Sequence, residues 1–423
     1  MNGFGLSRER FALLFAVMLV AAAGNTAMQS LLPAIGRELG VSDIWVAVAF
    51  SLSAVLWVVM APVWARRADR RGRRALMRLG LSGFIVSMLI CGAVLAAGLA
   101  GLFAPTLTFA IFMLGRALYG GMGSASPPAV QAYVAARTDG AVRTSALAAL
   151  ASSFGLGTII GPAIAPLFIF PPLGLSAPLF AFAAIAAIVL ALLVLRLPDD
   201  TPRNPARGPI VAYPAIGGAD AGVADEDPAP VRLRWRDPRV LPWLVAGIAG
   251  GHGQAALLGI IGFHVIDRLN VPLAHAQESI AIVLMSGAVA SLFAQWGLIP
   301  RLKLDPRQLV AWGAAIAALG TVVTGLSQAI YGITIGFALA SLGFGLFRPG
   351  FTSGASLAVG PHEQNAVAGQ VTSVNGLAYI AGAPLAVAAY QAGATVPFAA
   401  VAALMLGLAG WTMFKWRPSA RAA

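Results

Sequence analysis

The sequence predicts an all-α integral membrane protein with twelve transmembrane helices in two pseudo-symmetric six-helix bundles. Apolar residues make up 59% of the 423 positions and charged residues only 10%, a balance typical of a chain surrounded by lipid. A membrane span needs about 20 predominantly apolar residues, and the sequence holds about twelve such segments. One long hydrophilic stretch separates the first six segments from the last six. We therefore expect the chain to form two halves.

The hydrophilic stretch is rich in Pro, Gly and Asp, so it is expected to be a flexible linker. It divides the chain into an N-terminal bundle at 1–196, a cytoplasmic linker at 197–238, and a C-terminal bundle with a short cytoplasmic tail at 239–423. The predicted spans have the approximate ranges 11–32, 44–64, 79–99, 107–134, 145–169, 178–195, 241–265, 279–299, 309–328, 330–347, 366–390 and 395–414.

The basic residues predict the orientation of the chain. If the N-terminus is cytoplasmic, Arg116 lies within a span and only Arg37 and Arg268 face outward, which leaves 25 of the 28 basic residues on the cytoplasmic side. Lys and Arg are retained in cytoplasmic loops, so both termini are expected inside the cell. The net charge of +12 does not indicate a nucleic-acid partner, because the basic residues follow the loops between spans. Anionic lipids at the cytoplasmic face are the expected partners of these loops.

The first predicted span carries polar side chains, which include Asn25, Thr26 and Gln29. Polar groups are unfavourable where they face lipid, so these side chains are expected to face the interior of the bundle. Asn25 and Gln29 are therefore candidates for a substrate cavity. The alternative is a set of hydrogen bonds between helices without any contact to substrate.

The loop between the second and third spans, Pro62–Arg78, holds seven arginines and one carboxylate. Gly72 permits a tight reversal between antiparallel helices. Asp69 lies on the same predicted side of the membrane as the start of the 366–390 span, where the positive end of the helix dipole can attract a carboxylate. Such a contact would latch the two halves together. The alternative is a plain positive stop after a membrane span.

The run D-R-R-G-R-R at residues 69–74 resembles the motif G-x-x-x-D-R-x-G-R-R of the major facilitator superfamily. Ala65 takes the place of the first glycine of that motif, and Arg67 replaces an expected apolar residue. The resemblance implies the major facilitator fold and a role for this loop in stabilising the outward-open state. The residues that it assigns to conformational gating are Asp69, Arg70, Gly72, Arg73 and Arg74.

The fourth predicted span holds Arg116 about nine residues from its start, and an arginine at that depth marks a functional site by default. The local pattern resembles the family motif R-x-x-Q-G, with Tyr119 in place of glutamine and Gly120 matching. The resemblance implies that Arg116 handles protons or binds substrate charge, and it places Tyr119 beside the same cavity. The alternative is a structural arginine bonded to backbone carbonyl groups.

The fifth predicted span contains the spacing Gly157-x-x-x-Gly161-Pro162. Small residues four apart permit close helix packing, and a proline bends the helix. The spacing resembles the start of the family motif G-x-x-x-G-P-x-x-G-G, which is found in exporters, although Ala165-Pro166 replaces its last two glycines. The resemblance implies export and adds these three residues to the gating set. The alternative is a helix-packing face alone.

The second half places polar residues near the middle of two spans. His252 and Gln254 lie in the seventh span, and Asn375 and Tyr379 lie in the eleventh. Polar groups that converge from both halves are expected where an alternating-access transporter holds its substrate, although packing is the alternative for each one. Residues 297–307 form a faint copy of the first basic loop, as expected of a duplicated chain.

Together these motifs resemble those of the bacterial twelve-span drug:proton antiporters. The resemblance implies a secondary active transporter of the bacterial inner membrane that exports small lipophilic or amphipathic molecules by alternating access, in exchange for protons. It also implies a monomer without a cofactor or metal ion. Two alternatives remain. The chain is an exporter of an organic anion or endogenous metabolite such as a siderophore, or it is a non-transporting membrane receptor or assembly factor.

The proton carrier is not the one that the resemblance implies, because relatives place an acidic residue in the first span and this chain has none there. His252 is the candidate, since an imidazole changes its charge near physiological pH. Burial and the nearby charge of Arg116 would both disfavour its protonated form. The alternative is transport without proton coupling.

Enzymatic activity is not expected. The predicted spans offer only Arg116, His252 and His264 as ionisable groups near neutral pH, and these form no hydrolytic triad, carboxylate dyad or metal site. The sequence contains no G-x-x-x-x-G-K-[ST] loop, which argues against a pump driven by ATP.

Overall fold

The structure is a computed structural model that describes residues 7–135, 137–138, 140–198, 233–270, 272–360 and 363–415. Within these ranges the chain is helical apart from turns and short irregular segments, and they contain no β-strand. The predicted all-α class is confirmed. Most of the predicted linker, at residues 199–232, lies outside the described residues.

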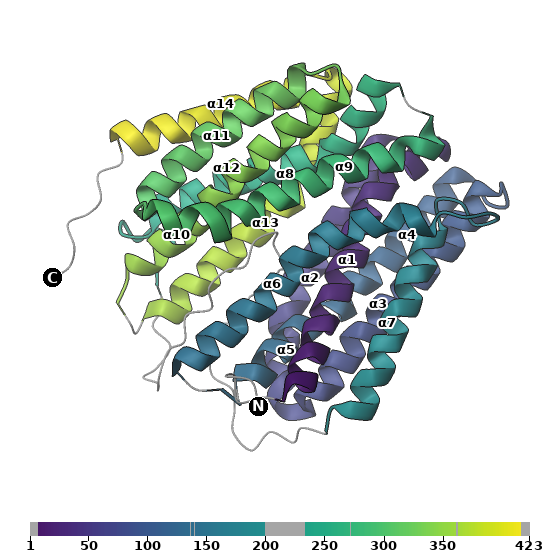
Figure 1. Cartoon of the computed structure of the whole chain (residues 1–423), viewed down its shortest axis with the longest axis horizontal. Coiled ribbons are helices and arrows are strands. Elements are labelled where there is room, and N and C mark those ends of the chain that lie inside the picture. Colours follow the sequence, from purple (N-terminus) through teal and green to yellow (C-terminus); the bar gives the residue numbers. More distant parts are fainter. Residues whose placement is uncertain are drawn as a thin grey trace. The chain divides into compact units, whose positions relative to one another are not determined.

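The chain divides into two compact units, each a bundle of helices (Figure 1). Unit 1 comprises Met1–Ala221 together with Pro272–Ala281, and unit 2 comprises Gly222–Val271 together with Ile282–Ala423. The short segment Pro272–Ala281 thus groups with the N-terminal helices, whereas the sequence places it within the C-terminal half.

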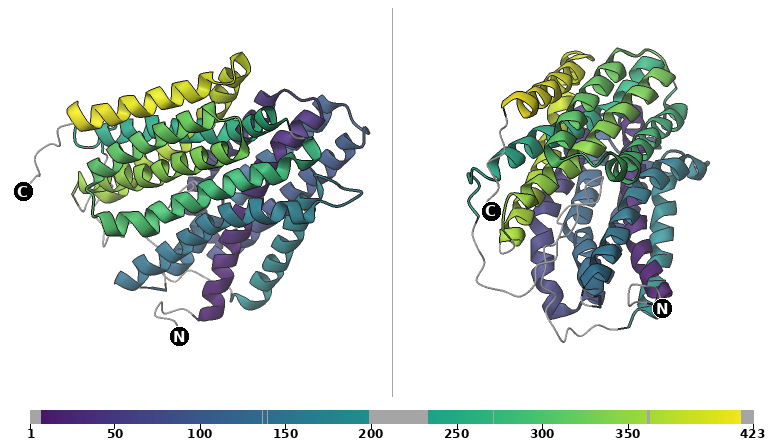
Figure 2. Two further views of the ribbon diagram at one scale, coloured as in Figure 1. Left: turned by 45° about the horizontal axis from the view of Figure 1, so that its top comes forward. Right: turned by 60° about the vertical axis from the view of Figure 1, so that its left-hand side comes forward.

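In unit 1, α4 and α5 flank a π-helical turn at Tyr119–Gly123, and the three pieces together occupy the predicted fourth span. The first helix packs along α6 and α7, and α3 packs along α4 and α7 (Figure 2). The helices of this unit are α1 (Arg8–Glu38), α2 (Asp43–Arg71), α3 (Arg73–Leu99), α4 (Pro105–Leu118), α5 (Ser126–Ala135), α6 (Gly140–Ile164) and α7 (Ala177–Arg196).

In unit 2, a π-helical segment at Phe293–Leu298 joins α9 to α10. The helices α8 and α13 pack along each other, as do α11 and α12. The helices are α8 (Leu241–Leu269), α9 (Leu273–Leu292, whose residues up to Ala281 belong to unit 1), α10 (Ile299–Leu302), α11 (Pro306–Leu326), α12 (Ile330–Leu357), α13 (Gln364–Ala392) and α14 (Val396–Gly410).

Glycines set the distance between α11 and α12. A Cβ atom placed on Gly320 would lie 2.1 Å from the backbone nitrogen of Ala340, and one placed on Gly343 would lie 2.3 Å from that of Ala317. No side chain fits at these distances, so the two backbones are in direct contact. Close packing through small residues is the usual way in which helices associate in lipid, where no hydrophobic effect drives them together.

Ten helices in the described ranges are long and apolar enough to cross a membrane, judged by length and composition. The two other predicted spans are also helical. The π-helical turn at Tyr119–Gly123 interrupts the fourth span, and the fifth contains a shorter apolar helix at Gly155–Phe168. Large apolar side chains on the outside of both units, such as Leu195 and Phe414, are 80% and 85% exposed. Such faces suit a lipid environment.

Candidate functional site

The buried guanidinium of Arg116 is the centre of the candidate site in unit 1. The residue is 2% exposed, and its Nη2 donates to Oδ1 of Asn25 on α1 at 2.8 Å. The guanidinium carbon lies 5.0 Å from the ring centre of Phe50 and 5.1 Å from that of Tyr119. A cation over the face of an aromatic ring is attracted by the ring quadrupole. Three of the predicted residues, Asn25, Arg116 and Tyr119, therefore lie together.

Backbone contacts fix the position of Arg116. The hydroxyl of Ser53 on α2 donates to the carbonyl oxygen of Arg116 at 3.0 Å, and the hydroxyl of Ser87 on α3 donates to that of Gly115 at 2.7 Å. A Cβ atom on Gly120 would lie 2.4 Å from the carbonyl oxygen of Ser53, so the π-helical turn after α4 packs directly on α2 at this point. The π-helical turn begins three residues after Arg116, and such turns often occur at functional sites.

A small pocket adjoins this cluster inside unit 1. The ring of Tyr119 lies 5.4 Å from that of Trp57 and 5.5 Å from that of Phe84, measured between ring centres, and all three residues line the pocket. The remaining lining residues are Val17, Met18, Ala21, Gly80, Leu81, Gly123, Ser126 and Pro127. This lining is almost entirely apolar. Gln29, the fourth predicted residue of this unit, is half-buried one turn beyond Asn25 on α1.

The glycine motif of α6 packs against the helix that carries Asn25. A Cβ atom on Gly161 would lie 2.1 Å from the carbonyl oxygen of Ala23, and Thr26 donates its hydroxyl to the carbonyl oxygen of Gly157 at 3.2 Å. Pro162 lies close to the end of α6, after which the chain continues as a short 3-10 helix. These contacts agree with a packing face, and they connect the candidate gating residues directly to α1.

The basic loop reverses at Gly72, as the sequence predicts. Gly72 has φ +83°, in the region that favours glycine, and it separates the end of α2 from the start of α3. Arg73 is only 2% exposed, and Arg74 donates through Nη2 to the carbonyl oxygen of Val194 near the end of α7. These two arginines therefore contact the protein, where the sequence predicts contacts with lipid. The side chains of Asp69 and Arg70 lie outside the described part of the chain.

The copy of this loop in unit 2 has a matching arginine. Arg307 at the start of α11 donates through Nε to the carbonyl oxygen of Thr412 at 2.7 Å and through Nη2 to that of Met413 at 2.8 Å. Thr412 and Met413 lie in the π-helical segment Trp411–Lys415 that follows α14. In each unit, an arginine at the start of the third helix of the half thus caps carbonyl groups at the end of the last one.

The predicted cavity residues of unit 2 lie on neighbouring helices. His252 on α8 is half-buried, and its Nδ1 lies 2.8 Å from the carbonyl oxygen of Ile248. A Cβ atom on Gly382 of α13 would lie 3.1 Å from the carbonyl oxygen of His252, so the two backbones are close there. On α13, Asn375 is 9% exposed and Tyr379 is half-buried, while Gln254 is half-buried on α8. The eight predicted cavity residues therefore divide equally between the two units.

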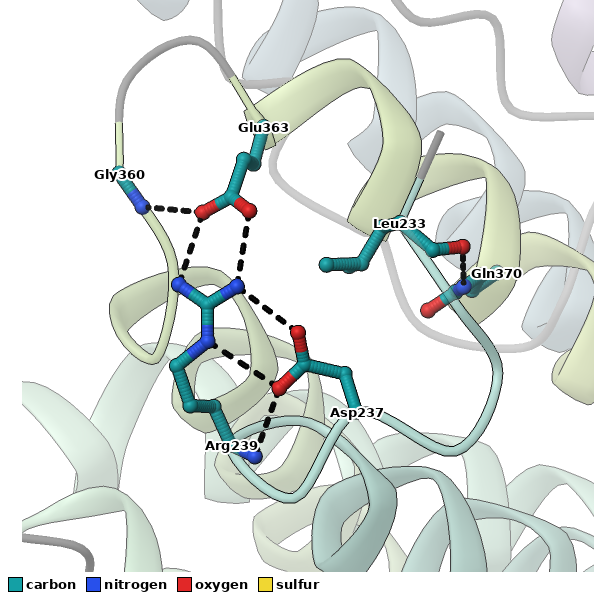
Figure 3. Close-up of polar contacts among 6 residues, drawn as sticks. All are labelled: Leu233, Asp237, Arg239, Gly360, Glu363 and Gln370. Atoms are coloured by element: carbon teal, nitrogen blue, oxygen red, sulfur yellow. Dashed lines mark hydrogen bonds and ion pairs between the residues drawn. The ribbon is translucent and has the colours of Figure 1, made fainter. Parts of the chain in front are cut away.

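The structure adds a charged cluster that the sequence analysis missed (Figure 3). Arg239, just before α8, donates to both oxygens of Glu363 at 2.8 and 2.9 Å and to both oxygens of Asp237 at 2.8 and 3.1 Å. These hydrogen bonds lower the pKa of both carboxyls. Gln370 on α13 also donates to the carbonyl oxygen of Leu233 at 2.9 Å (Figure 3). The segment before α8 is thereby fastened to the first turns of α13.

A turn held by this cluster presents a tryptophan between two arginines. The N–H of Asp237 donates to the carbonyl oxygen of Arg234 at 3.0 Å, which closes the turn. Trp235 is 53% exposed, and Arg234 and Arg236 are exposed on either side of it. The described residues hold no group of three or more His, Cys, Asp or Glu side chains that could bind a metal ion.

Comparison with known proteins gives matches along most of the chain. A family model described as the Major Facilitator Superfamily matches residues 13–383. The Staphyloferrin B transporter of Staphylococcus aureus is 29% identical over 199 residues, which cover 46% of this chain and 44% of that protein. The Multi-drug resistance efflux pump PmrA homolog of Lactococcus lactis is 34% identical over 168 residues, which cover 39% of this chain and 36% of that protein. The chain thus matches less than half of the length of either curated relative.

Among solved structures, the human organic anion transporter MFSD10 matches with a TM-score of 0.64. Its identity to this chain is 18%, and the match covers 96% of this chain and 100% of that one. At this identity the likeness concerns the fold alone.

Proposed function

Because the chain belongs to the Major Facilitator Superfamily, we propose that it is a secondary transporter that exports small lipophilic or amphipathic molecules. The observation that carries this proposal is the apolar, aromatic pocket beside the buried Arg116–Asn25 pair. Binding sites for small molecules are mostly apolar and hold a few polar groups that orient the ligand. Trp57, Phe84 and Tyr119 line the pocket with aromatic rings, and the guanidinium carbon of Arg116 lies 5.1 Å from the ring centre of Tyr119.

Alternating access is the proposed mechanism. Its moving parts would be the bundles at 1–196 and 239–423, joined by the linker at 197–238, with the cavity lined from both halves. The matching contacts of Arg74 and Arg307 support two related halves, the arrangement in which transporters place a substrate site between repeats. Under this proposal Asp69 latches the closed inner side through its attraction to the N-terminus of α13.

Exchange for protons is the proposed energy source, with His252 and Arg116 as the coupling residues. His252 is half-buried on α8, and an imidazole changes its charge near physiological pH. His252→Gln should abolish accumulation driven by an imposed pH difference and leave passive exchange of substrate intact. A variant that still concentrates substrate under that difference would eliminate His252 as the carrier.

The membrane setting follows from the same argument. We place the chain in the bacterial inner membrane as a monomer with both termini in the cytoplasm, as its basic residues predict. The exposed turn of Arg234, Trp235 and Arg236 supports a contact with anionic lipids, because arginine attracts anionic head groups and tryptophan prefers the membrane–water interface.

Export of an organic anion, such as a siderophore, is the second candidate. Arg116 supplies a buried positive charge next to Tyr119, which lines the pocket, and a guanidinium binds carboxylates through paired hydrogen bonds. The relative named as a Staphyloferrin B transporter supports the same class of substrate.

One experiment separates the two candidates. Cells that lack their own efflux pumps would express the chain or its Trp57→Ala variant, and the loss of lipophilic dyes and of carboxylate siderophores would be measured in parallel. Lower dye accumulation that a protonophore reverses, and that Trp57→Ala weakens, supports drug export. Siderophore release without any effect on dyes would overturn it in favour of the anion.

A further inference from the structure

A second histidine of α8, His264, is fully buried near the end of the helix. Its side chain is 0% exposed, and its Nε2 lies 3.0 Å from the carbonyl oxygen of Thr324 on α11. A carbonyl oxygen only accepts hydrogen bonds, so Nε2 carries the hydrogen and Nδ1 holds the free lone pair. Nδ1 is buried and has no hydrogen-bond partner among the described residues. It is therefore the atom of this side chain that can take up a proton.

Four helices of unit 2 meet around this imidazole. Its ring centre lies 4.5 Å from that of Phe398 on α14 and 6.2 Å from that of Tyr390 on α13. Together with Thr324 on α11 and its own helix, these contacts enclose the ring. A charge on His264 would thus be sensed by α8, α11, α13 and α14 at once.

Three charged or titratable side chains lie around His264. Asp267 is three residues further along α8, a spacing that puts both side chains on one face of the helix. Tyr390 donates its hydroxyl to Oδ2 of Asp267 at 2.9 Å, which ties α13 to α8. Arg268 donates to the carbonyl oxygen of Gly325 in the last turn of α11 at 3.4 Å and to Oε1 of Gln328 just after that helix at 3.2 Å.

We propose that Nδ1 of His264 is a proton-binding site whose occupancy moves Asp267 from Tyr390 to His264. A buried imidazolium needs a hydrogen-bonded counter-charge, and Asp267 is the carboxylate at the right spacing. Both the Tyr390 hydroxyl and an imidazolium would donate to a charged carboxylate, but only the imidazolium brings a full positive charge, so it competes with the hydroxyl for Asp267. Uptake of one proton would then weaken the contact between α8 and α13 at this end.

This inference rests on the proposed function for its role in transport. In the proposed orientation, the C-terminal end of α8 faces the outer solution, so acid outside the cell would load the site. The helix that is released, α13, carries Asn375 and Tyr379 of the proposed cavity. Proton binding near its far end would therefore reach the cavity along one helix, which contains Pro384 between Tyr390 and Tyr379.

The test compares purified full-length variants in detergent. His264→Gln keeps an amide N–H that can donate to Thr324 but binds no proton. The matched control is His275→Gln, which changes an exposed histidine in the first turn of α9. The melting temperature of each would be followed from about pH 5 to pH 8, where histidine titrates.

The melting temperature of wild type relative to His264→Gln should rise by about 2 °C or more as the pH falls across this range, because the folded state binds the proton, and His275→Gln should show no such rise. A relative fall, which a buried histidine that binds no proton in the folded state would give, overturns the proposal. A constant difference for His264→Gln overturns the proposal. If His264→Gln does not fold, two other variants test the proposal. Tyr390→Phe removes the hydroxyl that competes for the carboxylate, so the change of melting temperature with pH should occur at a higher pH than in wild type. Asp267→Asn removes the counter-charge, so this change should occur at a lower pH. A pH dependence equal to that of wild type in both variants overturns the proposal as well.

Transport gives a separate readout. Ethidium efflux from proteoliposomes would be measured against external pH for wild type and His264→Gln. If the melting temperatures support proton binding at His264 but the rate of efflux does not depend on an imposed pH gradient, the proposed exchange for protons is wrong and the proton-binding site is still supported. If His264→Gln keeps the wild-type melting profile, the inference fails whatever the efflux result.

Discussion

Arg116 is held at its side chain and at its backbone by different helices. Asn25 of α1 accepts a hydrogen bond from the guanidinium, and Ser53 of α2 donates one to the carbonyl group. The first contact holds the side chain, while the second fixes the backbone. Under the proposed function, the guanidinium could therefore exchange Asn25 for substrate without movement of its Cα atom.

We expect Arg116→Gln to lower transport by about 10- to 100-fold, since hydrogen bonds to a charged group contribute about 1.5–3 kcal/mol. Membrane insertion should be normal, because the backbone bonds to Ser53 and Ser87 persist. The matched control is Arg137→Gln, which removes another cation over an aromatic ring, that of Tyr133, away from the pocket. Equal losses in both variants, measured as initial rates in proteoliposomes, would contradict a specific role for Arg116.

The carboxyls of Asp237 and Glu363 make the cluster around Arg239 sensitive to acid. The hydrogen bonds from Arg239 lower their pKa values below the ordinary values of 3.8 and 4.5. A carboxyl with a lowered pKa in the folded state stabilises the fold fully above its unfolded pKa, and this contribution is lost as the pH falls through the folded value. The cluster therefore stabilises the protein at neutral pH and stops doing so in strong acid.

We expect Arg239→Gln to melt at a lower temperature than wild type at about pH 7, and the gap to close below about pH 4. High salt should also narrow the gap, because the Arg239 side chain is 40% exposed and its charge is screened. Arg234→Gln, an exposed neighbour without these contacts, serves as the control. A gap of constant size from pH 7 to about pH 3.5 would rule out the ion pairs as its cause.

At the scale of elements, the contact of α6 with α1 offers a sharp test of packing. Gly161→Ala would put a Cβ atom 2.1 Å from the carbonyl oxygen of Ala23, a backbone atom that cannot rotate away. Overpacking of this kind costs about 1–3 kcal/mol. Gly121→Ala is the matched control, because a Cβ atom there meets nothing within 4 Å. We expect a lower melting temperature for Gly161→Ala only, and similar values for both variants would refute the packing role.

The helices could be predicted from the sequence because apolar runs of span length have few other solutions in lipid. Their ends could not. For example, α1 runs from Arg8 to Glu38, well beyond the apolar run of 11–32, since hydrogen-bonded turns continue once the chain leaves the hydrocarbon. The π-helical turn at Tyr119–Gly123 was also missed, because it depends on contacts with α2 and α3 rather than on a local pattern.

The sequence predicted several residues of the candidate site, but it did not predict which of them contact each other. Depth in the span marked Arg116, but nothing in the sequence selects Asn25, 91 positions away, as its partner. The ion pair between Arg239 and Glu363 was missed for the same reason, because the two residues lie 124 positions apart in the sequence. Long-range pairings follow from how helices pack, which a single sequence does not record.

At the scale of the whole molecule, the linker joins the two halves of the chain. Residues 203–228 lie outside the described residues, and their composition is too poor in apolar side chains to build a core. We expect deletion of part of this segment to leave transport intact, and limited proteolysis to cut the wild type there first. Loss of dye efflux in a correctly inserted deletion variant would instead make the segment a regulatory or docking element.

The capping arginines have a consequence for the order in which the protein is made. Arg74 meets its carbonyl partner at Val194, and Arg307 meets its partners at Thr412 and Met413. The ribosome synthesises each arginine well before the residues that carry those carbonyl groups, so neither contact can form until the last helix of its half has been made. A nascent chain that stalls before Val194 or before Thr412 therefore lacks this link between the third and the last helix of that half.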